Sequence, residues 1–369
     1  MKIYYFVKNI DRVPSCHYNI LMLSDLGYEV TPVFGRSTKE IQYKLFDNGI
    51  KAIVLDDDND YSRSGLFFQY RKLVKSILKT DFSSDDLIFI GTGDTAICMT
   101  GLYRKHPTVL CIKELYDHAT LHRRMLIRLC RQATTVVACE LNRARYMKAE
   151  WGLKELPYVI PNKPYTDPLP KGNPGTTELT QKIIRSFANK KPIIYQANHI
   201  HYAKELINLA TALRNLEEEF ILVLVGNIDD PNDVEQIREI YPYVICTGYV
   251  KSPLHMEITS NAYIGITVYQ DNSLNNLFCA PNKIYEYSCF GIPTLANDVP
   301  GLIETVGLSR SGICVNWNSV DEIEKALIDI SLQYAEYEAF SLAFFKSVDC
   351  KQTIKDIVIQ TRRKYGEQI

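Results

Sequence analysis

Short apolar segments rich in β-branched residues alternate with longer amphipathic segments along the whole chain. Most of the short segments are apolar throughout, which is typical of strands in a parallel sheet that helices cover on both faces. This alternation predicts an α/β architecture. In the first half the predicted strands are Lys2–Val7, Glu29–Phe34, Ala52–Leu55, Leu87–Ile90, Thr108–Lys113, Thr135–Cys139 and Tyr158–Ile160. The helical patterns between them include Tyr18–Leu26, Phe67–Leu78, Leu121–Arg131 and Leu141–Glu150.

Between Pro161 and about Thr180 prolines and glycines replace the periodic apolar positions, which predicts a linker. A second alternation follows, with strands predicted at Pro192–Gln196, Phe220–Val225, Val244–Thr247, Tyr263–Val268, Thr294–Asn297 and Gly312–Val315. Helices are predicted at Lys204–Leu213, Pro231–Ile240, Asn282–Phe290, Val320–Ile330 and Thr353–Tyr365. The chain is therefore predicted to form two α/β domains joined by a Pro-rich hinge, residues 1–165 and 166–349. Parallel sheets bind ligands beyond their carboxyl ends, so we expect a shared cleft.

Composition narrows the class of protein. Hydrophobic residues make up 46% and charged residues 23% of the 369 positions, which is ordinary for a globular protein. A net charge of −1 gives no global electrostatic signal for nucleic acid, and none is predicted as a partner. None of the ten cysteines forms a C-x-x-C pair, so we interpret them as buried free thiols in a reducing compartment. Without an apolar stretch of membrane-spanning length or a signal-like start, the expected location is cytoplasmic.

The segment from Ala280 to Ala296 carries the sharpest chemical pattern. Pro281 or Asn282 starts a predicted helix, and Gly291 ends it as a left-handed cap. The amide groups at such a helix start can hold a diphosphate, and Glu286, one turn later, can accept hydrogen bonds from a ribose diol. An ordinary capped helix with an exposed glutamate remains the alternative.

This segment, P-N-K-I-Y-E-Y-x-x-x-G-I-P-T-L-A, followed by Asp298-Val299-Pro300-Gly301, resembles the signature helix of the family 4 retaining GT-B glycosyltransferases. It is most similar to the branch that builds bacterial surface polysaccharides. The resemblance implies that Glu286 holds the donor ribose and that backbone amides just before the helix hold the diphosphate. Pro281 and Asn282 at the helix start are included in the donor-binding site. Lys283 belongs to the same pattern. Phe278 occupies the position where the family usually has a first glutamate that grips the donor sugar.

Three further segments agree with the resemblance. Val159-Ile160-Pro161-Asn162 is similar to the family's boundary between the domains. The strand and turn Ile193–His199 imply a donor contact at Asn198, and the basic residue that neutralises the diphosphate is expected at Lys204, with Ala203 as the competing alignment. Cys246–Val250 is similar to the turn that contacts the nucleotide base. Tyr249 in this turn is a candidate to stack on the base, with simple packing as the alternative.

In the first half, Asp117 and His118 follow the strand Thr108–Lys113, where family members often have a histidine or acidic residue near the transferred sugar and the acceptor. The resemblance makes both catalytic candidates, together with Lys204. Alternatively, Asp117 caps a helix beginning near Ala119. Asp94, after Leu87–Ile90, is a candidate helix cap, and the acidic run 56–60 is interpreted as a solvated loop rather than a metal site.

Taken together, the resemblance implies a GT-B fold: two Rossmann-like lobes facing a central cleft, with the C-terminal helix, residues 350–369, crossing back to the first lobe. It implies a retaining glycosyltransferase that moves a sugar from a UDP- or GDP-type donor to a saccharide or lipid-linked saccharide acceptor. No cofactor and no metal are expected, because positive charge at the diphosphate suffices for this chemistry. The positive side chains of Leu121–Arg131 leave open a peripheral contact with the inner face of the cell membrane. A GT-B nucleotide-sugar epimerase and a non-catalytic binding or partner protein are the alternatives.

Overall fold

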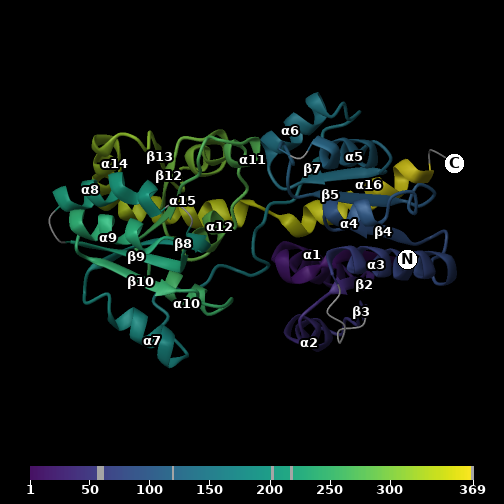
Figure 1. Cartoon of the computed structure of the whole chain (residues 1–369), viewed down its shortest axis with the longest axis horizontal. Coiled ribbons are helices and arrows are strands. Elements are labelled where there is room, and N and C mark those ends of the chain that lie inside the picture. The colour runs from purple at the N-terminus through teal and green to yellow at the C-terminus, as the bar shows by residue number, and fades with distance from the viewer. Residues whose placement is uncertain (56–61, 119, 201–202, 217–218, 367–369) are drawn as a thin grey trace. The chain divides into compact units, whose positions relative to one another are not determined.

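The computed structural model describes residues 1–55, 62–118, 120–200, 203–216 and 219–366 (Figure 1). The acidic run 56–60 lies outside these residues. The chain divides into two compact units. Unit 1 comprises Met1–Tyr165, Ser273–Asn275 and Asp349–Ile369, and unit 2 comprises Thr166–Asn272 and Asn276–Val348. Compared with the predicted boundaries, Ser273–Asn275 and Asp349 belong to the other unit.

Unit 1 is built on a seven-stranded sheet in the order β3-β2-β1-β4-β5-β6-β7, with every neighbouring pair parallel. The strands are β1 (Lys2–Asn9), β2 (Glu29–Arg36), β3 (Ile53–Val54), β4 (Leu87–Ile90), β5 (Thr108–Ile112), β6 (Thr135–Ala138) and β7 (Tyr158–Val159). The order reverses direction between β1 and β4. The predicted Leu87–Ile90 strand is confirmed residue for residue.

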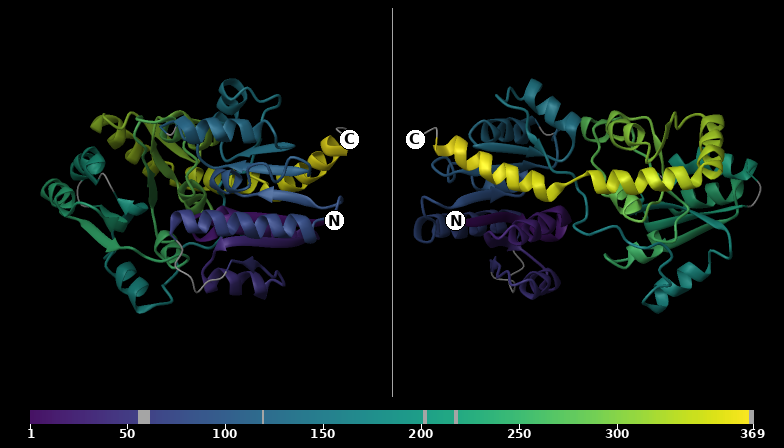
Figure 2. Two further views of the ribbon diagram at one scale, coloured as in Figure 1. Left: turned by 45° about the vertical axis from the view of Figure 1, so that its right-hand side comes forward. Right: turned by 180° about the vertical axis from the view of Figure 1, so that it is seen from behind.

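Helices cover both faces of this sheet (Figure 2). They are α1 (Pro14–Asp25), α2 (Lys39–Asp47), α3 (Arg63–Thr80), α4 (Gly93–Cys98), α5 (Thr120–Cys130), α6 (Leu141–Glu150) and α16 (Cys350–Gly366), with a short 3-10 turn, η1 (Ile10–Arg12). The C-terminal helix α16 packs against α1, β5, β6 and β7, burying Ile354, Ile357, Val358 and Thr361. The prediction that the last helix returns to the first lobe is therefore confirmed.

Unit 2 contains a six-stranded parallel sheet in the order β10-β9-β8-β11-β12-β13. The strands are β8 (Lys191–Ile200), β9 (Phe220–Ile228), β10 (Val244–Gly248), β11 (Ile264–Thr267), β12 (Thr294–Asn297) and β13 (Gly312–Val315). Here the strand order reverses between β8 and β11. The loops that follow these two neighbouring strands therefore lead away from each other. Such a reversal is where open α/β sheets bind ligands.

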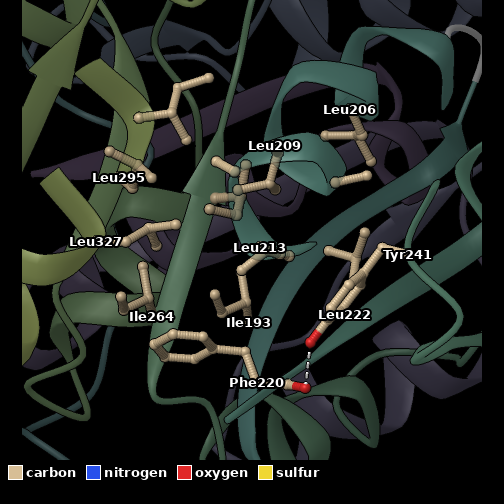
Figure 3. Close-up of a cluster of buried hydrophobic side chains, with 14 of the residues drawn as sticks. Ile193, Leu206, Leu209, Leu213, Phe220, Leu222, Tyr241, Ile264, Leu295 and Leu327 are labelled. Carbon is tan, nitrogen blue, oxygen red and sulfur yellow. Dashed lines mark hydrogen bonds between the residues drawn. The ribbon is translucent and has the colours of Figure 1, made fainter. Parts of the chain in front are cut away.

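The helices of unit 2 are α7 (Glu178–Arg185), η2 (Ala203–Leu206), α8 (Ile207–Asn215), α9 (Pro231–Ile240), α10 (His255–Thr259), α11 (Leu274–Leu277, which begins in unit 1), α12 (Lys283–Ser288), α13 (Pro300–Leu302), η3 (Ile303–Gly307), α14 (Val320–Leu332) and α15 (Tyr334–Ser347). Successive residues of β8 point to opposite faces of the sheet: Ile193 enters the core with α8, α9 and α14, whereas Ile194 enters the core with α12 and α15. Figure 3 shows the first of these cores, including the hydrogen bond from the Tyr241 hydroxyl to the Phe220 carbonyl, at 2.5 Å. Burial on both faces explains why β8 shows no alternation in its sequence.

Every cysteine is a free thiol, as predicted, and all but Cys246 and Cys314 are buried. The amphipathic pattern missed α2, α4, α7, α10, α11, α13 and α15. Of these, α15 is apolar around most of its circumference and so has no clear polar face to detect. Among the described residues, no helix combines the length and apolar character needed to cross a bilayer.

Candidate nucleotide-sugar site

A pocket of about 240 Å³ lies in unit 2 at the neighbouring strands β8 and β11, where the strand order reverses. Its lining includes Tyr195 and His199 from β8, Thr267 and Tyr269 from β11 and the loop after it, Glu205 from η2, and Lys283 from α12. The carboxyl ends of both strands and the start of α12 therefore supply polar side chains to one place. This composition suits a small polar ligand.

Tyr287 fixes α12 to the sheet at this point. Its hydroxyl is within hydrogen-bonding distance of the carbonyls of Ile194 on β8, at 3.1 Å, and Ile266 on β11, at 3.2 Å. Its ring lies against Gly265, where a Cβ atom would come within 2.3 Å of the ring. The helix therefore depends on a tyrosine and a glycine together, and both are needed to place its first turn beside the pocket.

The predicted cap at Gly291 is confirmed. Gly291 has φ of +70°, and the amide of Ile292 donates back to the carbonyl of Tyr287 at 3.1 Å, closing the end of the helix. The helix itself is shorter than predicted, because Asn282 is its N-cap and Ser288 its last residue. With only six residues, α12 contributes less electrostatic field than a long helix does.

The loop before α12 is held from the other side by Gly301. A Cβ at Gly301 would lie 2.7 Å from both the amide nitrogen and the carbonyl oxygen of Cys279, so the two backbones are in direct contact. This contact gives a physical reason for the glycine in the Asp298–Gly301 motif. Pro281 is buried in this loop, while Phe278 and Asn282 are partly exposed.

Glu286 is not the exposed glutamate of the alternative interpretation, because its side chain is only 16% exposed. Its Oε2 accepts a hydrogen bond from Nε2 of Gln196 at 2.6 Å, and its Oε1 lies 3.7 Å from Nε2 of His255. Burial alone would raise the pKa of Glu286. The interactions with His255, Lys283 and Gln196 outweigh burial and hold its pKa below the ordinary value, so the carboxylate is ionised at neutral pH.

Lys283 lines the pocket and is one turn before Glu286. Burial lowers the pKa of its ammonium group, while the nearby Glu286 opposes the change. Within the described part of the chain its Nζ has no hydrogen bond or ion pair. Thr267, 1% exposed, has a hydroxyl that also lacks a hydrogen-bond partner among the described residues. The pocket therefore offers a cation and a hydroxyl that remain available to a ligand.

The remaining candidates of unit 2 lie in nearby loops. Asn198 is exposed within a bulge of β8, where Gly226 of β9 approaches so closely that a Cβ would lie 1.9 Å from the Ala197 carbonyl oxygen. Lys204 lies in η2 beside the pocket-lining Glu205, and its side chain is outside the described part of the structure. Tyr249 follows β10 and is 53% exposed, so its ring is not used in packing the core.

In unit 1, Asp117 and His118 follow β5 as predicted from the sequence, but their surroundings differ. Asp117 is largely buried, and its Oδ2 accepts a 2.7 Å hydrogen bond from the amide of Leu274, at the start of α11. His118 is 79% exposed, with Nε2 3.8 Å from Asp117 Oδ2. The hydrogen bond described for Asp117 is therefore with α11, and not with the helix near Ala119 that it was expected to cap in the alternative interpretation.

Asp94 is not a helix cap, because Thr92 caps α4 through the amide of Thr95. Three side chains lie close to the Asp94 carboxylate instead, near the point where the strand order of the unit 1 sheet reverses. The hydroxyl of Tyr116 donates to its Oδ1 at 3.4 Å, Nε2 of His122 lies 3.2 Å from the same oxygen, and Nζ of Lys8 lies 3.9 Å from Oδ2. Tyr116 has φ of +55°, a conformation rare for a bulky residue.

Several residues of the site were not predicted from the sequence. Gln196, His255 and Thr259 contact Glu286 directly or through one another, and Thr267 lines the pocket. For Gln196 a signal existed, since an amide side chain follows three apolar residues in a strand predicted to be buried. Nothing local marks His255 or Thr259, because the contacts arise only when α10 packs beside α12.

The sequence of unit 2 matches a known family model. Residues 190–332, which include β8 to β13 and α12, match the family described as glycosyl transferases group 1. No curated protein matches the sequence.

Solved structures resemble the whole chain. The Anabaena protein Alr3699/HepE in complex with UDP and glucose is 15% identical, with a TM-score of 0.67 and 98% of each chain covered. Sucrose-phosphate synthase from Thermosynechococcus elongatus is 15% identical, with a TM-score of 0.63, covering 100% of this chain and 99% of the other. The MnaA–UDP structure from S. aureus is 14% identical, with a TM-score of 0.58, covering 97% and 94%. The chain thus has the predicted α/β fold of GT-B glycosyltransferases, with two Rossmann-like units.

Proposed function

We propose that this protein is a retaining glycosyltransferase that binds a nucleotide-diphosphate sugar in unit 2. One observation carries the proposal: a largely buried, ionised Glu286 lies one turn after the pocket-lining Lys283, at the reversal of the sheet. A carboxylate in that position can accept hydrogen bonds from both ribose hydroxyls, while the ammonium group attracts a diphosphate. The match of residues 190–332 to glycosyl transferases group 1 supports the same assignment.

The donor in this proposal is of the UDP or GDP type. UDP is favoured because Alr3699/HepE and MnaA were each solved with it. Lys283, the amides before α12 and Lys204 bind the diphosphate, Tyr249 stacks on the base, and Asn198 contacts the donor from the bulge of β8. No metal ion or cofactor is needed in this scheme, because the lysines neutralise the leaving group.

The reaction breaks the bond between the anomeric carbon and the diphosphate oxygen and forms a bond from that carbon to an acceptor hydroxyl oxygen on the same face. The hydroxyl proton passes to the departing diphosphate, so no protein nucleophile is required. Asp117 and His118, which follow β5, are the proposed residues near the transferred sugar and the acceptor. The acceptor is a saccharide or lipid-linked saccharide used in building cell-surface polysaccharide, at a cytoplasmic location that includes the inner face of the membrane.

A panel of UDP-, GDP- and CMP-sugars tests the proposal, read by thermal stabilisation and by slow hydrolysis of the donor. We expect the UDP- or the GDP-sugars to stabilise the protein and to release free nucleoside diphosphate, and the CMP-sugars, which carry a single phosphate, to do neither. Neither stabilisation nor hydrolysis with any donor would contradict the proposal. An epimerase, the second candidate, would convert the sugar while leaving it attached to the nucleotide, and a binding protein would show stabilisation without turnover.

Glu286→Ala gives the residue-level test. Losing charge-assisted hydrogen bonds to two hydroxyls should weaken donor affinity about 10- to 100-fold. Glu239, exposed on α9, provides the control: Glu239→Ala should bind the donor like the wild type. Unchanged affinity in Glu286→Ala would remove the ribose assignment.

A further inference from the structure

Gln196 is an amide side chain buried in the sheet of unit 2. It lies in β8, follows three apolar residues and is 4% exposed. A buried amide is costly unless both its donor and its acceptor are hydrogen-bonded. Both are: Nε2 donates to Glu286 Oε2 at 2.6 Å, and Oε1 accepts from the Thr259 hydroxyl at 2.7 Å.

The chemistry of the partners fixes the direction of this chain of hydrogen bonds. An ionised carboxylate can only accept, so the amide nitrogen of Gln196 must face Glu286 and its oxygen must face Thr259. The Thr259 hydroxyl must then donate to Gln196. Its single proton has a competing acceptor in the His255 carbonyl at 2.9 Å, but the contact with Gln196 is the shorter one. Thr259 thus orients the amide, and the amide orients the carboxylate.

His255 approaches Glu286 from the other oxygen. It lies one turn before Thr259 on α10, with its Nε2 3.7 Å from Glu286 Oε1. The two carboxylate oxygens are therefore contacted by side chains of different elements: Oε2 by a residue of β8 and Oε1 by a residue of α10. Because each oxygen has two lone pairs, the carboxylate can still accept hydrogen bonds from two ligand hydroxyls while it is held in this orientation.

We infer that Gln196, oriented by Thr259, is a positioning residue that aims Glu286 at the ribose hydroxyls and so makes the site discriminate ribonucleotides from deoxyribonucleotides. This inference rests on the proposed function, since it takes a nucleoside diphosphate as the ligand. The hydroxyl at C2′ is the group that distinguishes the two kinds of nucleotide. If the Glu286 carboxylate were free to rotate, ligand binding would have to fix its orientation. The entropic cost of doing so would reduce its preference for that hydroxyl.

Calorimetric titration with UDP and 2′-deoxy-UDP tests the inference, or with GDP and 2′-deoxy-GDP where guanine is the base that binds. The wild type should prefer the ribonucleotide at least about 10-fold, the effect of a hydrogen bond to a charged group. Gln196→Leu and Thr259→Val should lose about 10-fold in affinity for the ribonucleotide and less than about twofold for the deoxyribonucleotide. Thr259→Ser keeps the hydroxyl and should keep the preference.

Gln236→Leu, at an exposed position of α9, is the matched control and should bind both nucleotides like the wild type. If Gln196→Leu does not fold, the pair Thr259→Val and Thr259→Ser decides the matter. Variants that keep the full preference, or that weaken both nucleotides equally, would overturn the positioning role and leave the proposed function standing. A wild type that binds neither UDP nor GDP would overturn the proposed function itself, and this inference with it.

Discussion

The ring of Tyr287 occupies the space where a side chain of residue 265 would otherwise lie, 2.3 Å from the ideal Cβ position. This relationship brings the first turn of α12 onto the strands β8 and β11, and with it Lys283 and Glu286.

Gly265→Ala should therefore destabilise unit 2. A methyl group at that position must displace the ring, and overpacking of this kind costs about 1–3 kcal/mol. Chemical denaturation followed by circular dichroism measures the change in the free energy of unfolding. Gly307→Ala is the control, since a Cβ there meets only Cys314 Sγ and Ile303 Cγ2, at 3.7 and 3.8 Å. Equal stability of both variants would refute the close packing.

The stability of the protein should depend on pH through Glu286. Its pKa in the folded state lies below the ordinary 4.5, so the ionised carboxylate stabilises the fold above that value. This contribution is lost as the pH falls through the folded-state pKa. The difference in unfolding free energy between the wild type and Glu286→Gln should be constant from neutral pH down to about 5 and should shrink below it. A difference that does not change with pH would contradict the assignment.

Binding of UDP should be coupled to proton uptake at alkaline pH. Burial lowers the pKa of Lys283, and a diphosphate placed beside the ammonium group would raise it again. Calorimetry at about pH 9–10 in buffers of different ionisation enthalpy measures the protons taken up. Lys283→Met should abolish most of the uptake, whereas Lys182→Met, on the exposed face of α7, should not. The same uptake in both variants would place the diphosphate elsewhere.

Asp117 combines a structural contact with a proposed role in the reaction, and two substitutions separate them. Asp117→Asn keeps an oxygen that can accept from the Leu274 amide, so its stability should stay within about 0.5 kcal/mol of the wild type. Asp117→Ala removes the acceptor and should cost about 1–2 kcal/mol. If the charge serves the reaction, both variants should lose at least about 10-fold in donor hydrolysis. Full activity of Asp117→Asn would leave Asp117 a structural role alone.

Local sequence patterns were sufficient to predict most of the framework. The strands of both sheets, the ends of α6 and α9, and the Gly291 cap follow from apolar runs and from the known preferences of capping residues. The resemblance of residues 280–296 to a known signature helix located the candidate site. These features depend on neighbours within a few residues, which is why the sequence alone was enough.

Contacts between distant residues were not predictable in this way. Gln196 meets Glu286 across 90 residues of sequence and Thr259 across 63, so the partners are brought together only by the fold. Asp94 was interpreted as a cap because it follows a strand and a glycine turn, yet Thr92 takes that role and leaves Asp94 to Tyr116 and His122. In each case competition between possible partners decided the outcome, and local patterns do not contain that information.

The packing of α16 has a consequence for the order in which the protein can be made. The hydroxyls of Thr361 and Thr135 share a buried hydrogen bond of 2.7 Å, and Ile354, Ile357 and Val358 complete the core of unit 1. In the chain these residues follow every residue of unit 2. Although its first residues precede unit 2, unit 1 therefore cannot bury its last apolar face until α16 has been synthesised, which happens only after the whole of unit 2.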